Sequence, residues 1–132
     1  MNAAIEFHDS TLVAVERRDD TVVVRLNAYL HRSEGRPGYD AGTGWIQVVE
    51  LTFAGGLVER SPAELPLELD DGELTSDFET QFLLALPAAS IGDIRFTTCG
   101  LYGDELIVRG NGLVVKTLDE ARYVEDFPGT NP

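Results

Sequence analysis

The residues best suited to chemistry lie near the N-terminus, in the segment Phe7-His8-Asp9-Ser10. It contains a hydroxyl, an imidazole and a carboxylate, which are the three groups of a hydrolytic triad. On an extended backbone consecutive side chains point to opposite faces, so His8 and Ser10 share a face while Asp9 cannot orient the imidazole. We therefore predict a structural motif, in which Asp9 and Ser10 close a turn by hydrogen-bonding nearby backbone N–H groups and His8 is partly buried.

A second candidate site is the segment 31–44, which has no periodic apolar pattern and four glycines. We expect it to be a loop, and loops of this length in compact domains are usually functional or disordered. Arg, Tyr and Trp dominate binding hot spots, and the glycines would let the backbone adapt to a ligand. The predicted partner-binding residues are His31, Arg32, Arg36, Tyr39 and Trp45. The alternative is a mobile surface loop after which Trp45 simply joins the core.

Metal and cofactor chemistry finds little support in the sequence. His8 and His31 are the only histidines, so a metal centre would need carboxylates for most of its ligands. The run Asp70-Asp71-Gly72-Glu73 lacks the alternating ligands of a calcium-binding EF-hand loop, and we interpret it as an acidic turn. Cys99 is the only cysteine and lies in a strand-like run, which indicates a buried thiol. We expect no cofactor and no metal.

The elements that must position these residues are strands, because apolar residues recur with period 2 almost throughout. Arg18-Asp19-Asp20 and Gly110-Asn111-Gly112 are predicted hairpin turns, and Pro66 indicates an edge strand. About eight or nine short strands and little helix predict an all-β fold, an antiparallel β-sandwich or small barrel. The predicted core residues are Val13, Val22, Val24, Leu26, Val49, Leu51, Phe53, Phe82, Leu84, Phe96, Ile107 and Val115.

Length and composition indicate a single domain over residues 1–132, with 43% hydrophobic residues and a net charge of −13. The acidity argues against nucleic acid and anionic membrane surfaces as partners, because binding them requires a basic stripe. No apolar run reaches the ~20 residues of a membrane-spanning helix. The first residues resemble no signal peptide, which together with the lone cysteine favours the cytoplasm.

The opening Phe7-His8-Asp9-Ser10-Thr11-Leu12 resembles the His-Asp-Ser opening of several small bacterial domain families, some of them immunity-type proteins that neutralise a partner toxin. The closing segments 108–113 and 123–128 are similar to the ends of such domains. The resemblance covers about a quarter of the chain. It implies a compact, β-rich intracellular binding domain, and it implies no catalytic residues.

Two functions from different classes follow from these residues. The first is a non-enzymatic intracellular binding module for another protein, of the immunity type if the resemblance holds, acting through an acidic surface and the segment 31–45. The second is a small β-fold hydrolase or isomerase that uses His8 or His31 as its acid or base. The absence of a recognisable catalytic motif favours the first. If His8 and His31 shared a cleft with a carboxylate, the enzyme would gain support. The oligomeric state does not follow from the sequence.

Overall fold

The computed structural model describes residues 1–76 and 79–130, which form ten strands and no helix. The strands are β1 (Asn2–Arg18), β2 (Thr21–Ser33), β3 (Gly42–Phe53), β4 (Leu57–Arg60), β5 (Leu67–Ser76), β6 (Thr80–Gln81), β7 (Leu83–Leu86), β8 (Ala89–Gly100), β9 (Glu105–Thr117) and β10 (Arg122–Phe127). Within these residues no helix could cross a membrane. The predicted all-β fold is confirmed.

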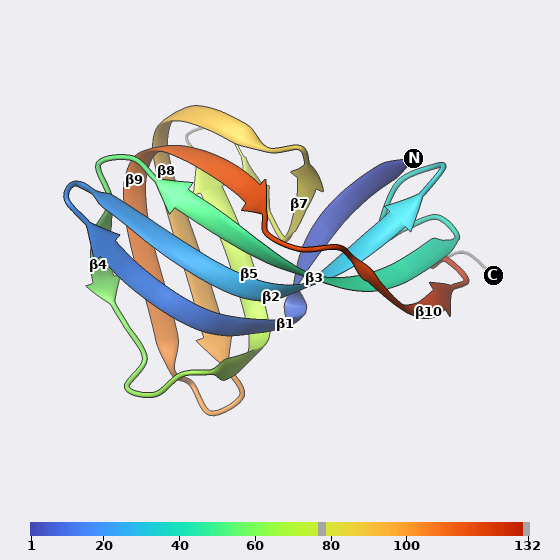
Figure 1. Ribbon diagram of the computed structural model, residues 1–132, viewed down its shortest axis with the longest axis horizontal. Coiled ribbons are helices and arrows are strands. Elements are labelled where there is room, and N and C mark those ends of the chain that lie inside the picture. Colours follow the sequence, from blue (N-terminus) through green and yellow to red (C-terminus); the bar gives the residue numbers. More distant parts are fainter. Residues whose placement is uncertain (77–78, 131–132) are drawn as a thin grey trace.

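Six strands close into an antiparallel barrel in the order β3-β2-β1-β5-β8-β9, with β9 pairing back to β3. Strands β1, β2 and β3 are longer than the barrel and continue beyond it. Their far ends form a second small sheet with β7 on one edge and β10 on the other, which we call the lobe. Figure 1 shows the barrel and the lobe side by side, with these three long strands running through both.

The core fills the barrel with residues that alternate along each strand. Phe7, Phe53 and Phe96 are fully buried at its centre, with ring centroids 5.1 Å apart for Phe7 and Phe96 and 5.9 Å apart for Phe53 and Phe96. Burial of large apolar side chains is the main stabilising contribution to such a fold. The largest buried side chains therefore lie in the barrel, from which the lobe extends.

Two predicted turns are wrong. Gly110-Asn111-Gly112 lies within β9, and none of its residues is among those with positive φ. A Cβ on Gly110 would lie 2.9 Å from the carbonyl oxygen of Ala54, so glycine serves close backbone approach here instead of a turn. Asp70-Asp71-Gly72 likewise lies within β5, where a Cβ on Gly72 would lie 2.5 Å from the Cβ of Phe7. The Asp19-Asp20 hairpin between β1 and β2 is confirmed.

Three predicted core residues are also wrong. Val13 is exposed because a register shift between Leu12 and Ala14 interrupts the alternation of β1. Phe82 is exposed because it stands between β6 and β7, outside both strands. Ile107 is half-buried. The buried neighbours on either side of it are Leu106 and Val108.

Pro66 does not mark an edge strand. Strand β5 begins directly after it, at Leu67, and pairs with β1 on one side and β8 on the other. The missing N–H of proline therefore lies outside the ladder of hydrogen bonds, which is where a strand tolerates it.

Candidate functional site

The His8-Asp9-Ser10 motif is the point at which β1 passes from the lobe into the barrel. Glu6 pairs with Tyr29 and Thr11 with Asn27, so residues 7–10 of β1 face a single residue of β2. Four residues opposite one make an extended bulge, which bends β1. Asp9 within it has a φ of 74°, in the left-handed region. Before the bulge β1 pairs with β7, and after it with β5.

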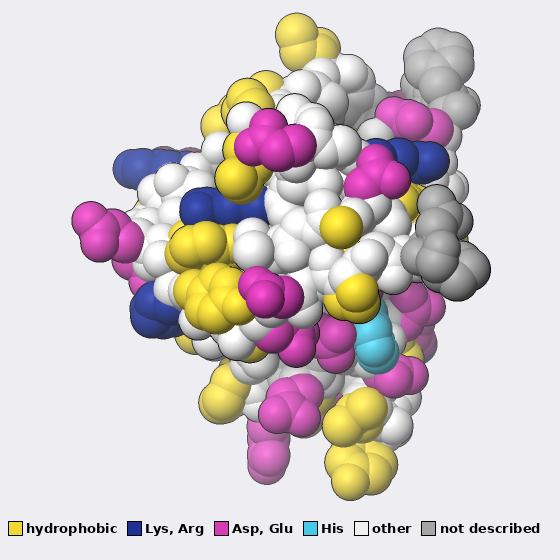
Figure 2. All heavy atoms as spheres, turned by 90° about the vertical axis from the view of Figure 1, so that its right-hand side faces the viewer, with side chains coloured by type: hydrophobic (Ala, Val, Ile, Leu, Met, Phe, Trp, Pro, Cys, Tyr) yellow, Lys and Arg dark blue, Asp and Glu magenta, His cyan; other side chains and the backbone are white. Residues whose placement is uncertain are grey.

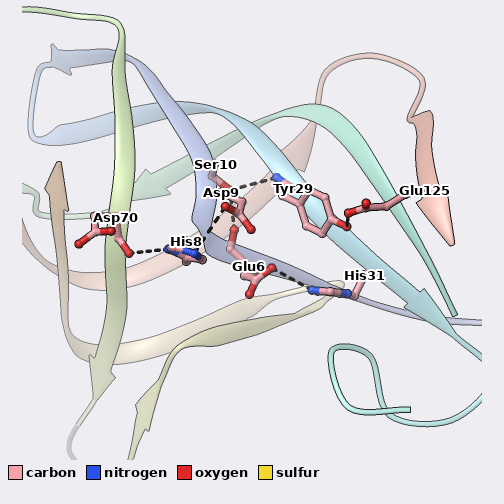
Figure 3. A network of polar contacts seen from close by, with 8 residues as sticks. All are labelled: Glu6, His8, Asp9, Ser10, Tyr29, His31, Asp70 and Glu125. Carbon is pink, nitrogen blue, oxygen red and sulfur yellow. Dashed lines mark hydrogen bonds and ion pairs between the residues drawn. The ribbon is translucent and has the colours of Figure 1, made fainter. Parts of the chain in front are cut away.

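Ser10 holds the bulge together from inside. Its side chain is 1% exposed, and its Oγ donates to the carbonyl of Glu6 at 2.6 Å and accepts from the N–H of Tyr29 at 3.0 Å. Both hydrogen-bonding roles of the hydroxyl are thus taken by the backbone (Figure 3). Asp9 has no such bond to a backbone N–H among the described residues, and its carboxylate is exposed, 3.5 Å from Nε2 of His8. The predicted backbone contact therefore belongs to Ser10 and not to Asp9.

His8 is exposed rather than partly buried, with 56% of its side chain accessible. Its Nδ1 donates to the backbone carbonyl of Asp70 on β5 at 2.6 Å (Figure 3). This hydrogen bond is the largest effect and raises the pKa of His8 above its ordinary value of 6.5; burial lowers the pKa by a smaller amount, and the nearby carboxylate of Asp9 raises it again. His8 is therefore a surface imidazole whose protonated form is stabilised by the carbonyl of Asp70.

His31 is buried in the lobe, although the sequence placed it in an exposed loop. It is 6% exposed, and its Nε2 lies 2.9 Å from Oε2 of Glu6, on the neighbouring strand β1. The rings of Tyr29 and Phe127 contact it edge-on, with centroids 5.1 Å and 4.8 Å away. Such a position anchors β10 and orients Glu6, but it leaves His31 no direct contact with a ligand.

The hydroxyl of Tyr29 continues this network to the outermost strand of the lobe. It donates to Oε1 of Glu125 on β10 at 2.7 Å (Figure 3). Burial of the phenol, and then this hydrogen bond to a carboxylate, raise the pKa of Tyr29 strongly. Tyr29 therefore stays neutral and serves as a fixed hydrogen-bond donor.

The predicted loop is shorter than expected and folds back over the lobe. Strand β2 extends to Ser33 and β3 begins at Gly42, so the loop comprises only residues 34–41. Gly38 has a φ of 84°, and a Cβ there would lie 2.7 Å from Cδ1 of Leu83. Only glycine therefore lets the loop lie this close to β7.

Between this loop and the segment 79–85 lies a groove made of two adjoining cavities of about 230 and 380 Å³. We call it the loop groove. Its two cavities share Tyr39, Phe82 and Leu83, and the first also reaches Glu6 and His8. The rings of Tyr39 and Phe82 are 42% and 58% exposed. The guanidinium of Arg36 lies 3.9 Å over the Tyr39 ring.

The five residues predicted to bind a partner lie in three different surroundings. Arg36 and Tyr39 border the loop groove, and His31 is buried beneath the loop. Arg32 and Trp45 lie on the other face of the lobe, because neighbouring residues of β2 point to opposite sides. There the guanidinium of Arg32 lies 4.4 Å over the Trp45 ring, which also contacts the exposed Tyr123 at 5.6 Å.

The sequence reasoning missed Glu6 and Phe82. Glu6 stands two residues before His8, a spacing that places both side chains on one face of a strand and could have indicated it. Phe82 was assigned to the core by its alternation with Leu84. Within the described residues no group of three or more His, Cys, Asp or Glu side chains is placed to hold a metal ion.

The end of the molecule occupied by the lobe is shown in Figure 2. Acidic side chains outnumber basic ones on it, and hydrophobic side chains lie exposed between them. A comparison with known protein families, curated proteins and solved structures finds no match for this chain. Its function is therefore inferred from its own geometry.

Proposed function

We propose that the chain is a non-enzymatic binding module whose loop groove receives a basic and partly apolar segment of another protein. The observation that carries the proposal is the exposure of two aromatic rings, Tyr39 and Phe82, beside the carboxylate of Glu6. Exposed large apolar groups that gather in a groove are typical of interaction sites.

The chemistry of the groove favours a cation. The face of an aromatic ring attracts ammonium and guanidinium groups, and Arg36 already makes this contact with Tyr39 within the chain. Glu6 would accept hydrogen bonds from a partner's Lys or Arg beside the Phe82 ring. The net charge of −13 would accelerate the approach of a basic partner and disfavour an acidic one.

An immunity-type role, in which the chain neutralises a basic toxin, is the specific form of this proposal suggested by the resemblance of its opening segment. A gene for such a toxin beside the gene for this chain would support that form. A basic partner of another kind would support the binding module without it.

The second candidate function is acid–base catalysis in the same groove. In its favour, Glu6 contacts His31 and lines one cavity with His8, so both histidines lie around one carboxylate. Against it, His31 is shielded from the groove, and both hydrogen-bonding roles of the Ser10 hydroxyl are taken by backbone groups. With His31 shielded and the Ser10 hydroxyl occupied, the exposed His8 has neither of these groups as a catalytic partner. This arrangement fits binding better than hydrolysis.

The test is affinity capture from the source cell with three forms of the chain, followed by mass spectrometry. The forms are the wild type, Phe82→Ser in the groove, and Ile91→Ser as a control that removes a fully exposed apolar side chain from β8. We expect a basic protein to be recovered with the wild type and the control and lost with Phe82→Ser. Recovery of the same proteins with all three forms would contradict the proposal.

Single variants distinguish the loop groove from the opposite face of the lobe, which the sequence analysis had treated as one binding surface. Arg36→Gln alters the loop groove, whereas Arg32→Gln alters the face that carries Trp45. We expect the captured partner to respond to the first and not to the second. The opposite result would move the binding surface to the other face of the lobe.

A further inference from the structure

A cavity of about 510 Å³ lies on the barrel, and it shares no lining residue with the loop groove. Strands β5, β8 and β9 together with the segment 55–57 border it. This volume lies in the range of small-molecule binding sites. The groups that line it and carry the argument below are Thr75, Ser76, Asp93, Arg95, Arg109 and Asn111.

Two arginines stand side by side on neighbouring strands in this cavity. Arg95 on β8 is the register partner of Arg109 on β9, so both side chains stand on the same face of the sheet. Thr75 is opposite Arg95 on its other side, and Leu57 is opposite Arg109. These four residues form one row across the outer face of the barrel.

Such a pairing is unfavourable by itself, because like charges directly opposite each other on a sheet destabilise it. It also uses two of the ten basic residues of a chain with 23 acidic ones. Arg25 and Arg60, in contrast, each form an ion pair with a carboxylate on an adjacent strand, Glu50 and Glu105. Arg95 and Arg109 instead have each other as register partners.

Among the described residues, one of these two charges has an ion-pair partner. Oε1 of Glu59 lies 3.1 Å from Nε of Arg109, and Asp93 lines the cavity. Within the described residues Arg95 makes neither an ion pair nor a hydrogen bond through its side chain. The hydroxyls of Thr75 and Ser76 and the amide of Asn111 add neutral hydrogen-bond donors around the two guanidinium groups.

We propose that this cavity binds a small molecule through an oxyanion group, a phosphate or a carboxylate, held between Arg95 and Arg109. A guanidinium presents two parallel N–H groups to such an anion, and two neighbouring guanidiniums on one face of the sheet can bind it together. Asn111 and the exposed side chain of Leu57 would contact the rest of the ligand. This site is independent of the loop groove and of the protein partner proposed above.

The test is a titration of the full chain at low ionic strength, followed by amide chemical shifts. The probes are inorganic phosphate, adenosine 5′-monophosphate and succinate, which separate a bare phosphate, a phosphate monoester and a carboxylate. We expect saturable shifts at millimolar concentrations, confined to residues around Arg95, Arg109 and Asn111. If none of the three probes produces saturable shifts there, the proposal is overturned.

Two variants with the same change in net charge make the test specific. Arg95→Gln removes one side of the site, whereas Arg122→Gln removes an exposed arginine in the lobe that pairs with Asp119. We expect Arg95→Gln to weaken binding about tenfold or more and Arg122→Gln to leave it unchanged, because only a local contact distinguishes the two. An equal loss in both variants would show a general charge effect and overturn the site.

The melting temperature of Arg95→Gln shows whether this variant folds as the wild type does. Arg95 is exposed, so Arg95→Gln should fold. Without an anion we expect its melting temperature to equal or exceed that of the wild type, since the like-charge repulsion is gone. Phosphate should then raise the melting temperature of the wild type alone. A rise of the same size in the variant would contradict the proposal.

Discussion

The change Ser10→Ala tests the role of the bulge that joins the lobe to the barrel. It deletes one hydroxyl from a position that is 1% exposed and creates almost no cavity. Two backbone groups lose their partner, the N–H of Tyr29 and the carbonyl of Glu6. Nothing else in the side chain changes, so the effect on stability reports these two hydrogen bonds.

The magnitude follows from the burial of the two orphaned groups. A buried polar group left without a partner costs about 1–3 kcal/mol. The N–H of Tyr29 belongs to a buried residue and should incur this cost in full. The carbonyl of Glu6 belongs to a partly exposed residue, where water can replace the lost partner. We therefore expect Ser10→Ala to lower the free energy of unfolding by about 2–4 kcal/mol. Because Glu6 lies directly before this bulge, its contact with His31 should loosen as well.

The assay is urea unfolding followed by circular dichroism, with the midpoint and the slope fitted separately. The matched control is Thr98→Val, because Thr98 is also 1% exposed but its Oγ1 has no partner among the described residues. Removing that hydroxyl should leave stability unchanged or raise it by about 1 kcal/mol. A loss below about 0.5 kcal/mol for Ser10→Ala, or equal losses for both variants, would refute the reasoning.

Three further predictions concern the neighbouring residues. Asp9→Gly should be more stable than Asp9→Ala by about 1 kcal/mol in the same unfolding assay, because the φ of 74° favours glycine; equal stabilities would contradict this. Leu51→Ala should cost about 2–5 kcal/mol because Leu51 is fully buried, whereas Phe82→Ala should cost under about 0.5 kcal/mol because its ring is exposed; a large loss at Phe82 would place its ring in the core. The pKa of His8, followed by NMR, should exceed 6.5 because its protonated ring donates to the carbonyl of Asp70. The stabilisation from this contact is then complete below pH 6.5 and is lost as the pH rises through the raised pKa, so a His8→Gln variant should lack that decline.

The local pattern of the sequence determined the strands, because a half-buried strand needs an apolar residue at every second position whatever its neighbour is. Val22, Val24 and Leu26 in β2, and Val49 and Leu51 in β3, are buried as that alternation requires. Where apolar and polar residues do not alternate, the prediction of the buried face failed. The run Leu106-Ile107-Val108 is apolar throughout and therefore contains nothing to show which residue faces inward.

Which strands meet, and in which register, was decided only in three dimensions. Glu6 and His31 are 25 positions apart, and their contact depends on the pairing of β1 with β2 on the lobe side of the bulge. Arg95 and Arg109 face each other only because β8 and β9 pair in that one register. A shift by a single residue would move every side chain to the opposite face. The alternation of apolar residues can be recognised within one strand. A site needs side chains from several strands, and the register between those strands is set by the whole folded sheet.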